Sequence, residues 1–427
     1  MGSTLIEKIL AAHSGGQAVR PGDRADAQPD QIVLDERSAG RLLDRIEAAG
    51  APAVARADRL RVIPGHFIPR IDPRQASIYG RLARFAKQHR LKGLMALGRG
   101  GSLPVEWMDA GGALPGGLVV GSDGHLTDAG AVACAGLPVP FDALVSALAG
   151  APVSLEVPET IRVRLAGVPG RWCSGRDLML RLLSELGPEV LSGRALELYG
   201  PALDRLDVVD RLAMSSLAFE AGARIALCAT DETALAWLRA RIAAPLEHLL
   251  PDGDAVYEQV LELDLDGQEP MIALSPSPFQ VRRLSELPDL AVDQVVIGSR
   301  SGGRIEDLRM AARLLKEHTV SDNLRLLVIP GSHKAFQHAA EEGLVAILIR
   351  SGALVAAPTS GLFEAEAGGT LGENEVCVTT TTANPAGFQG PPSSKIHLVS
   401  PAVAAATAVI GRLAHPDEVL RSRRESV

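Results

Sequence analysis

The stretch that decides the fold is QVVIGSRSGGRIEDLRMAARLLK, residues 294–316. Its first five residues, Gln294 to Gly298, form a short apolar run that is typical of a buried strand. Ser299 to Gly303 supplies the residues of a turn, and Arg304 to Lys316 has the apolar spacing of a helix. A buried strand that turns directly into a helix is one step of an α/β fold with parallel strands. Arg300 is therefore expected at the carboxyl end of a strand, where open α/β sheets bind their ligands.

Strands and helices alternate on both sides of this stretch. We predict strands at 61–63, 117–120, 160–165, 324–329 and 346–349, and helices at 4–12, 38–49, 75–88, 175–186, 208–223, 333–342 and 401–414. Such alternation predicts an α/β protein built on mostly parallel sheets. Its domains are expected at residues 1–156, 157–279 and 280–427, since new runs of strands and helices begin near Val157 and Gln280.

Composition excludes several classes of function. The chain has 427 residues, a formal net charge of -8 and 3% aromatic residues, so it offers neither a basic footprint nor stacking platforms for nucleic acid. Its longest apolar runs are too short to span a bilayer, and its first residues lack the pattern of a signal peptide. We expect a cytoplasmic protein that binds no nucleic acid and no membrane.

The four cysteines give no sign of a metal or disulfide framework. They are Cys134, Cys173, Cys228 and Cys377, far apart in sequence and without a paired C-x-x-C spacing. Zinc knuckles and small disulfide-rich domains need closely spaced cysteines. Buried, reduced thiols are the expected state of all four.

Six segments, in order, carry a resemblance to one family. They are TLIEKIL (4–10), VVGSDGH (119–125), MSSLAFEAGA (214–223), IGSRSGGRIEDLR (297–309), APTSG (357–361) and SPAVAAA (400–406). Together they resemble the large subunit of 3-isopropylmalate dehydratases, members of the aconitase superfamily. The resemblance implies three α/β domains around a central cleft, with mostly parallel sheets. It also implies that the family's swivel domain is not in this chain, and that a small-subunit-like partner carries it.

The resemblance breaks at the cofactor. Where the family has the three cysteines that hold its [4Fe-4S] cluster, this chain has Arg300, Ser360 and Phe363. Iron–sulfur clusters are held by thiolates, so we expect no cluster and no other cofactor. Arg300 has two interpretations that stay open: it anchors an anionic substrate through paired hydrogen bonds, or it fills the vacated space by pairing with an internal acid. Ser360 can donate a hydrogen bond, and Phe363 supplies only bulk.

The residues with which the family holds its substrate have also changed. Its two arginines fall in a segment that here reads Thr382 to Phe388, and both positions are lost, as Ala383 and Phe388. Asn384 lies in the same segment. The candidate substrate-binding residues are therefore Arg300, Ser360 and Asn384.

Four ionisable residues keep positions that the family uses for catalysis. They are His66, Asp123, His125 and Glu220, and the fold implied by the resemblance brings them together. The residue before His66 is a glycine instead of the family's aspartate, Gly124 replaces a serine, and Ser216 replaces an asparagine. Imidazoles beside carboxylates suit general acid/base catalysis, or one divalent metal ion at Asp123 and His125. A relic hydrogen-bond network that holds the loops is the third possibility.

The functional hypothesis is a lyase, of the hydro-lyase or isomerase type, that needs no cluster. It would act on a small carboxylate-bearing metabolite, with acid/base residues and Arg300 in place of the cluster. Because protonation by histidine assists hydroxide poorly, a substrate more activated than malate-type acids is expected. Two alternatives remain open: a non-catalytic homologue that binds a metabolite or a small-subunit-like protein, and a mononuclear-metal enzyme.

Overall fold

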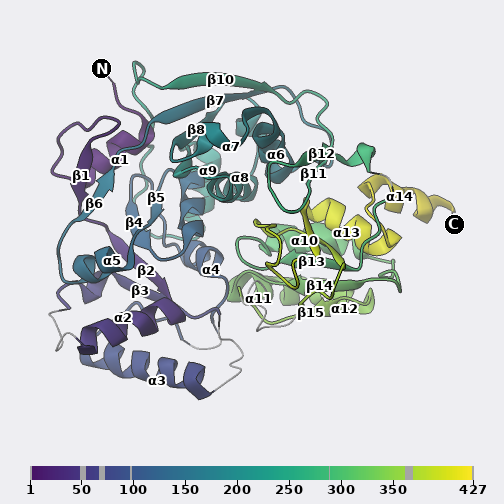
Figure 1. Cartoon of the computed structure of the whole chain (residues 1–427), viewed down its shortest axis with the longest axis horizontal. Helices are drawn as coiled ribbons and strands as arrows, with labels where there is room; N and C mark the ends of the chain where they lie inside the picture. The colour runs from purple at the N-terminus through teal and green to yellow at the C-terminus, as the bar shows by residue number, and fades with distance from the viewer. Residues whose placement is uncertain are drawn as a thin grey trace. The chain divides into compact units, whose positions relative to one another are not determined.

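The computed structural model describes residues 2–48, 54–66, 73–96, 99–287, 289–360 and 369–425. For residues 422–425 it describes the backbone alone. The chain divides into two compact units. Unit 1 comprises Met1–Ala166 and Val190–Asp264, and unit 2 comprises Gly167–Glu189 and Leu265–Val427. Each unit is described by itself below, with the labels of Figure 1.

Unit 1 contains two four-stranded parallel sheets and one antiparallel pair of strands. The first sheet has the order β3-β2-β4-β5, the second has the order β10-β7-β8-β9, and β1 pairs with β6. The strands are β1 (Arg24–Ala27), β2 (Gln31–Asp35), β3 (Leu60–Ile63), β4 (Leu118–Gly121), β5 (Ala135–Pro138), β6 (Val153–Glu156), β7 (Thr160–Ala166), β8 (Ala195–Tyr199), β9 (Ile225–Cys228) and β10 (Gln259–Asp264).

Helices connect these strands, as parallel pairing requires. They are α1 (Leu5–His13), α2 (Glu36–Ala48), α3 (Pro73–Gln88), α4 (Leu103–Asp109), α5 (Phe141–Leu148), α8 (Val208–Glu220) and α9 (Glu232–Arg239), with short 3-10 segments η1 (Ala57–Arg59), η2 (Gly124–Val132) and η3 (Leu203–Arg205). The chain returns to unit 1 within α7 (Pro188–Leu191). The predicted first helix is confirmed: Thr4 caps α1, and the Glu7 carboxylate accepts the backbone N–H of Thr4.

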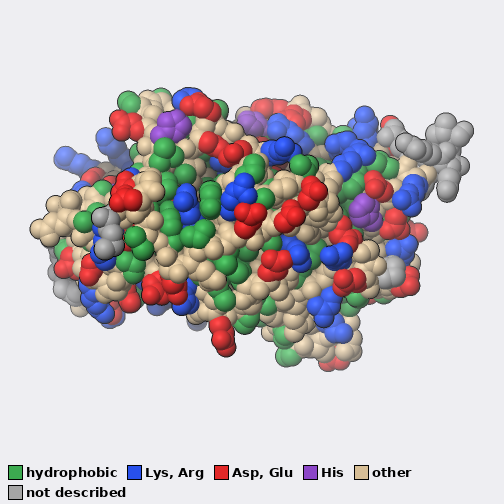
Figure 2. Space-filling view, turned by 90° about the horizontal axis from the view of Figure 1, so that it is seen from above, with side chains coloured by type: hydrophobic (Ala, Val, Ile, Leu, Met, Phe, Trp, Pro, Cys, Tyr) green, Lys and Arg blue, Asp and Glu red, His purple; other side chains and the backbone are tan. Residues whose placement is uncertain are grey.

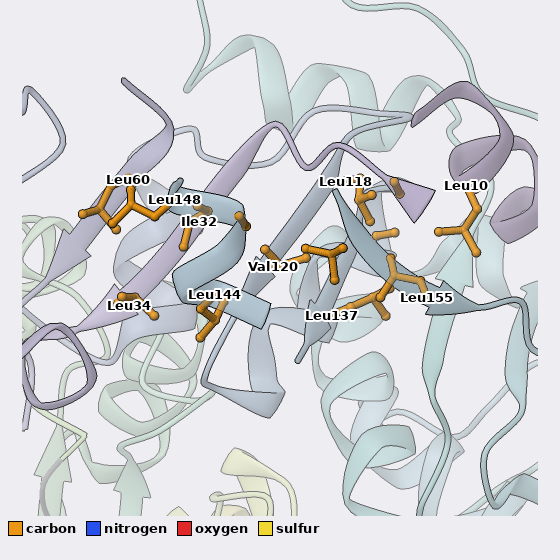
Figure 3. Close-up of a cluster of buried hydrophobic side chains, with 14 of the residues drawn as sticks. Leu10, Ile32, Leu34, Leu60, Leu118, Val120, Leu137, Leu144, Leu148 and Leu155 are labelled. Atoms are coloured by element: carbon orange, nitrogen blue, oxygen red, sulfur yellow. The ribbon is translucent and has the colours of Figure 1, made fainter. Parts of the chain in front are cut away.

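An aliphatic core covers one face of the first sheet. Leu34, Val120 and Leu137 of its strands lie in one buried cluster with Leu144 of α5 (Figure 3). Leu10 and Leu155 belong to the same cluster. Each such buried side chain contributes about 1.5–3 kcal/mol relative to an exposed one. The apolar residues of β2, β3 and β4 thus determine which face of the sheet packs in the core. Polar residues lie at or shortly after the carboxyl ends of these strands.

Unit 2 is built on one seven-stranded sheet of order β12-β11-β17-β16-β13-β14-β15. The five strands from β17 to β15 are parallel, and β11 and β12 are antiparallel additions. The strands are β11 (Met271–Ala273), β12 (Val281–Arg283), β13 (Gln294–Gly298), β14 (Arg325–Ile329), β15 (Leu354–Val355), β16 (Val376–Thr379) and β17 (Lys395–Leu398). The predicted strand at 294–298 is therefore confirmed, and it lies inside the sheet beside β14 (Figure 1).

The helices of unit 2 are α6 (Gly175–Leu186), α10 (Ile305–Leu315), α11 (His333–Glu341), α12 (Leu344–Arg350), α13 (Pro401–Ile410) and α14 (Pro416–Glu425), with the 3-10 segment η4 (Leu284–Glu286). At the start of α6 the buried Asp177 carboxylate accepts hydrogen bonds from the Ser174 backbone N–H and hydroxyl and from the Met271 backbone N–H. Burial raises the pKa of Asp177. This carboxylate ties α6 to β11.

One predicted element is wrong. The run Ala346 to Ile349 was expected to be a strand, and it lies in the helix α12. A four-residue apolar run cannot distinguish a strand from a buried turn of helix, because both place apolar side chains on a neighbour. Leu344 and Leu348, four residues apart, pack on the core of unit 2, whereas Ile349 is exposed.

The α/β fold with mostly parallel sheets is confirmed. The division into three domains remains a prediction, although each sheet draws its strands largely from one predicted segment. In the described part of the chain no helix has the length and apolarity needed to cross a membrane. Figure 2 shows one face of the molecule, on which acidic and basic side chains are interspersed.

The buried His397 of β17 gives a testable pH dependence of stability. Its Nδ1 accepts the Ser275 backbone N–H at 3.0 Å, and burial lowers its pKa from 6.5 to about 4. Between these values the unfolded chain binds more protons than the folded one, so the free energy of unfolding falls as pH falls from 6.5 to 4. The full loss is up to about 3 kcal/mol.

Urea unfolding at several pH values measures this contribution. His397→Gln keeps an acceptor without a titrating ring, so its stability should fall less over this window than that of the unmodified protein. His318→Gln, at a partly exposed histidine, serves as the matched control. Equal pH slopes in the unmodified protein and His397→Gln would contradict the assignment.

Candidate active site

The first sheet of unit 1 ends in polar residues at its carboxyl edge. Asp35 is the last residue of β2, His66 follows β3, and Asp123 and His125 follow β4. Because β2 lies between β3 and β4 and all three are parallel, these ends meet at one edge of the sheet. The four predicted acid/base residues all belong to unit 1.

Both ring nitrogens of His125 are held by one helix. Its Nε2 lies 2.9 Å from Oε1 of Glu220, and its Nδ1 lies 3.0 Å from Oγ of Ser216. Ser216 and Glu220 are one turn apart on α8, so a single helix face supplies both partners. Phe219 of the same helix packs its ring against the imidazole at 5.6 Å between centroids and 73° between planes. The structure thus brings His125 and Glu220 into contact.

Exposure differs sharply along this chain of groups. The side chain of His125 is 0% exposed and Ser216 is likewise buried, whereas the Glu220 side chain is 21% exposed. In the tautomer with hydrogen on Nε2, Nε2–H faces Glu220 and Nδ1 faces the Ser216 hydroxyl. Of these three side chains, that of Glu220 is the one exposed to solvent.

Asp123 positions His125 from the other side. Its Oδ1 accepts the backbone N–H of His125 at 2.9 Å, and it is the N-cap of η2. A metal ion bound by Asp123 and His125 would have to displace Ser216 or Glu220 from the ring. Among the described residues no three His, Cys, Asp or Glu side chains gather in a way that could hold a metal ion.

Asp35 is a site residue that sequence reasoning missed. Its Oδ2 lies 3.4 Å from Nδ1 of His66, so His66 does have a neighbouring carboxylate although residue 65 is glycine. Glu36 adds a second acid, because its Oε2 accepts the Gly65 backbone N–H at 2.8 Å. The sequence signal was the pair Asp35-Glu36 directly after the apolar run 32–34, at the end of a strand that was not predicted.

Gly124 and Phe219 form a matched pair. A Cβ added at Gly124 would lie 2.1 Å from Cε1 and Cζ of Phe219, so a larger side chain fits only if this ring moves. In the family that the sequence resembles, a serine stands at position 124. The aromatic ring that packs on His125 therefore depends on the glycine.

Arg300 lies in a strained turn of unit 2. Ser299 and Arg300 have φ values of 64° and 42°, in the left-handed region that few residues other than glycine adopt. Gly298 and Gly303 permit the turn to approach β14, because a Cβ at either would meet the carbonyl oxygen of Ile329 within 2.3 Å. Strain of this kind is characteristic of functional turns.

The Arg300 guanidinium lies over the ring of Phe388, with 5.8 Å from Cζ to the ring centroid. This is within the range of a cation–π contact. Phe388 occupies a position at which the family has a substrate-binding arginine. The positive charge lost at residue 388 is thus regained close by, on a different loop of the same unit.

Within the part of the chain that the structure describes, buried polar atoms without a hydrogen-bond partner gather at the carboxyl ends of the unit 2 strands. They are Oγ of Ser299, Ser301, Ser360 and Ser400 and Oδ1 of Asn384. These residues follow β13, β15, β16 and β17, all of them parallel strands of one sheet. Buried polar groups are normally hydrogen-bonded, so five unsatisfied atoms at one sheet edge indicate a place for water or a polar ligand.

The residues at the family's cluster positions do not fit a [4Fe-4S] cluster. Arg300 and Ser360 carry no thiol, and Phe363 lies outside the described residues. Three of the chain's own cysteines, Cys134, Cys228 and Cys377, are fully buried, and burial raises the pKa of each to about 12.

Comparisons with known proteins agree with this architecture. The Aconitase family (aconitate hydratase) matches residues 8–290 and 284–411. The chain is 35% identical over 420 residues to the 3-isopropylmalate dehydratase large subunit of Halothermothrix orenii, covering 98% of this chain and 100% of that protein. It is 36% identical over 421 residues to the large subunit of the same name from Moorella thermoacetica, covering 99% and 100%. Among solved structures, Thermococcus kodakaraensis aconitase X (holo-form) aligns with a TM-score of 0.46 and 12% identity, over 88% of this chain and 89% of that chain.

The fit between Gly124 and Phe219 is testable by a double-mutant cycle. Gly124→Ser forces the Phe219 ring away from His125 and should cost about 1–3 kcal/mol of stability. Phe219→Ile should cost about 1–2 kcal/mol by removing ring contacts, while making room for the serine. The double variant should lose about 1 kcal/mol or more less stability than the sum of the losses in the two single variants, as measured by urea unfolding. Additive costs would show that the two residues do not depend on each other.

Proposed function

Because the chain belongs to the aconitase family, we propose that it is a lyase for a small carboxylate-bearing metabolite that works without a [4Fe-4S] cluster. The family relation supports lyase-type chemistry. The proposed reaction rests on one observation, the chain of contacts from Ser216 through His125 to Glu220. Of these three side chains, only the Glu220 carboxylate is exposed to solvent.

Glu220 is the proposed base. It accepts the proton of a C–H bond that a neighbouring carboxylate or carbonyl makes acidic. The electron pair of that bond becomes the new C=C bond, and the bond to the leaving group on the adjacent carbon breaks with its own pair. The Nε2–H of His125 keeps the Glu220 carboxylate oriented toward the substrate, and the Ser216 hydroxyl keeps the ring in the required tautomer.

His66 is the proposed acid. It donates a proton to the departing group, and the Asp35 carboxylate lies 3.4 Å from its Nδ1. The Gly65 N–H bond to Glu36 holds the loop that precedes it. A histidine assists a leaving group less than a Lewis acid does, so the substrate should carry a better leaving group, or a more acidic C–H, than malate-type acids.

The proposed anchor for a substrate carboxylate is Arg300, with Ser360 and Asn384 as hydrogen-bonding residues. Guanidinium binds carboxylate through two parallel hydrogen bonds. The strained turn at Arg300 and the unsatisfied atoms of Ser360 and Asn384 support this role. The absence of thiols at Arg300 and Ser360 supports a reaction that needs no cluster.

A partner chain is part of the proposal. The relatives are large subunits by name, and this chain aligns with them over their full length. We therefore expect a small-subunit-like protein to bind it. The cytoplasmic location stays a prediction.

The second candidate function is a non-catalytic homologue that binds a metabolite or such a partner. It is favoured by the replacement of both family arginines, as Ala383 and Phe388. The two functions differ in one respect that can be measured, which is whether the protein removes a proton from carbon.

The test is exchange of carbon-bound hydrogen with solvent deuterium, followed by NMR for a panel of small hydroxy, di- and tricarboxylates. The proposal expects exchange for at least one of them. Glu220→Gln should lower the exchange rate at saturation about 100-fold or more. Arg300→Gln should instead raise the substrate concentration needed for half-maximal rate about tenfold.

Glu262→Gln is the matched control for Glu220, because Glu262 is an exposed residue of β10 whose Arg164 ion pair contributes little. Arg309→Gln is the control for Arg300, since Arg309 forms a surface ion pair with Glu342. Exchange that survives Glu220→Gln unchanged would refute the assigned base. No exchange with any compound, with and without a small-subunit-like partner, would favour the non-catalytic homologue.

A further inference from the structure

A pocket of about 640 Å³ lies beside β3 in unit 1 and has no part in the proposed reaction. It is lined by Gln31 at the start of β2, by Arg61 and Ile63 of β3, by Trp107 of α4, and by the segments that follow α3 and α4. Pockets of this volume are typical of sites for small organic molecules. His66 and Asp35, at the carboxyl ends of the same two strands, are not among its lining residues.

The lining is positively charged although the chain is acidic. Arg61, Arg90 and Lys92 supply three cations, and Asp58 is the one carboxylate among the lining residues. Asp58 is already paired with Arg56, at 3.4 Å. In a protein of net charge -8, a pocket with an excess of cations concentrates anions from solution.

The Arg61 side chain lines the pocket and is fixed by hydrogen bonds. Its Nη1 donates to the carbonyl oxygens of Asp58 and Leu60, at 2.7 and 3.1 Å, which fixes the guanidinium while leaving its other nitrogens to a ligand. Gly93 makes room for it, because a Cβ there would lie 2.9 Å from Cδ of Arg61. A guanidinium fixed in advance loses little entropy when it binds an anion.

Part of the lining is apolar. Ile63, Met95 and Trp107 line the pocket and pack in one cluster. The Trp107 Nε1–H donates to Gln31 Oε1 at 3.1 Å, and Gln31 Nε2 donates to the Gly112 carbonyl at 2.8 Å. The indole is therefore locked in place, and this part of the lining offers apolar surface beside the cations.

We propose that this pocket is a second ligand site, which binds a small organic anion with a carboxylate or phosphate head and an apolar body. The head contacts Arg61 and Lys92, and the body lies on Ile63, Met95 and Trp107. The ligand does not touch the reacting groups, so the site is independent of the proposed lyase activity.

Isothermal titration of the full chain with hexanoate and with phenyl phosphate tests the proposal and distinguishes the two heads. At least one should bind with a Kd below about 1 mM, and inorganic phosphate should bind at least about tenfold more weakly than phenyl phosphate. Arg61→Gln and the exposed Lys92→Gln should each weaken binding about tenfold, and Asp58→Asn should strengthen it.

Two controls localise the binding. Arg164→Gln, at an exposed arginine of the same unit, should leave the affinity unchanged, and so should Arg300→Gln, which removes the proposed substrate anchor. The proposal is overturned if neither probe binds, or if Arg61→Gln and Lys92→Gln both bind as tightly as the unmodified protein. Equal affinity for inorganic phosphate and phenyl phosphate would overturn the role of the apolar lining.

Discussion

The two hydrogen bonds that His125 makes to α8 are the constraint on which unit 1 depends. His125 lies in the first turn of η2. The same segment packs against the second sheet, where Gly130 approaches the Ala226 carbonyl so closely that a Cβ would lie 1.8 Å away. The Ser215 hydroxyl of α8 donates to the same carbonyl. The segment η2, which follows β4, thus contacts both the helix α8 and the strand β9 of the second sheet. Its contact with α8 positions Glu220. A histidine that holds this much structure is well placed to orient a carboxylate.

Unit 2 shows how the chemistry of one sheet edge has changed. Thiol positions of the family became a guanidinium at Arg300 and a hydroxyl at Ser360, and the arginine position at 388 became an aromatic ring. The Arg300 guanidinium lies over the Phe388 ring, so residues at two of these positions are neighbours. A guanidinium and a hydroxyl are hydrogen-bond donors, and we propose that they bind an oxyanion at this edge.

The sequence predicted the α/β fold and most of its strands and helices. The strand 294–298 was predictable because a buried parallel strand is an unbroken apolar run. The segment 346–349 was not, since its short apolar run fits either element. Asp35 was missed because β2 was not predicted, so the acidic pair Asp35-Glu36 was not recognised as the end of a strand. The role of Ser216 required the coordinates, because only they show that its hydroxyl reaches Nδ1 of His125.

The most direct test of the account is the iron and acid-labile sulfide content of anaerobically purified protein, together with its visible absorption. The account predicts a colourless protein with less than about 0.1 iron per chain, whose deuterium exchange is unaffected by an iron chelator. A brown protein that holds about four iron and four sulfide ions per chain would contradict it. Thiolates from elsewhere in the chain would then have to hold the cluster, and the acid/base residues of unit 1 would act beside it.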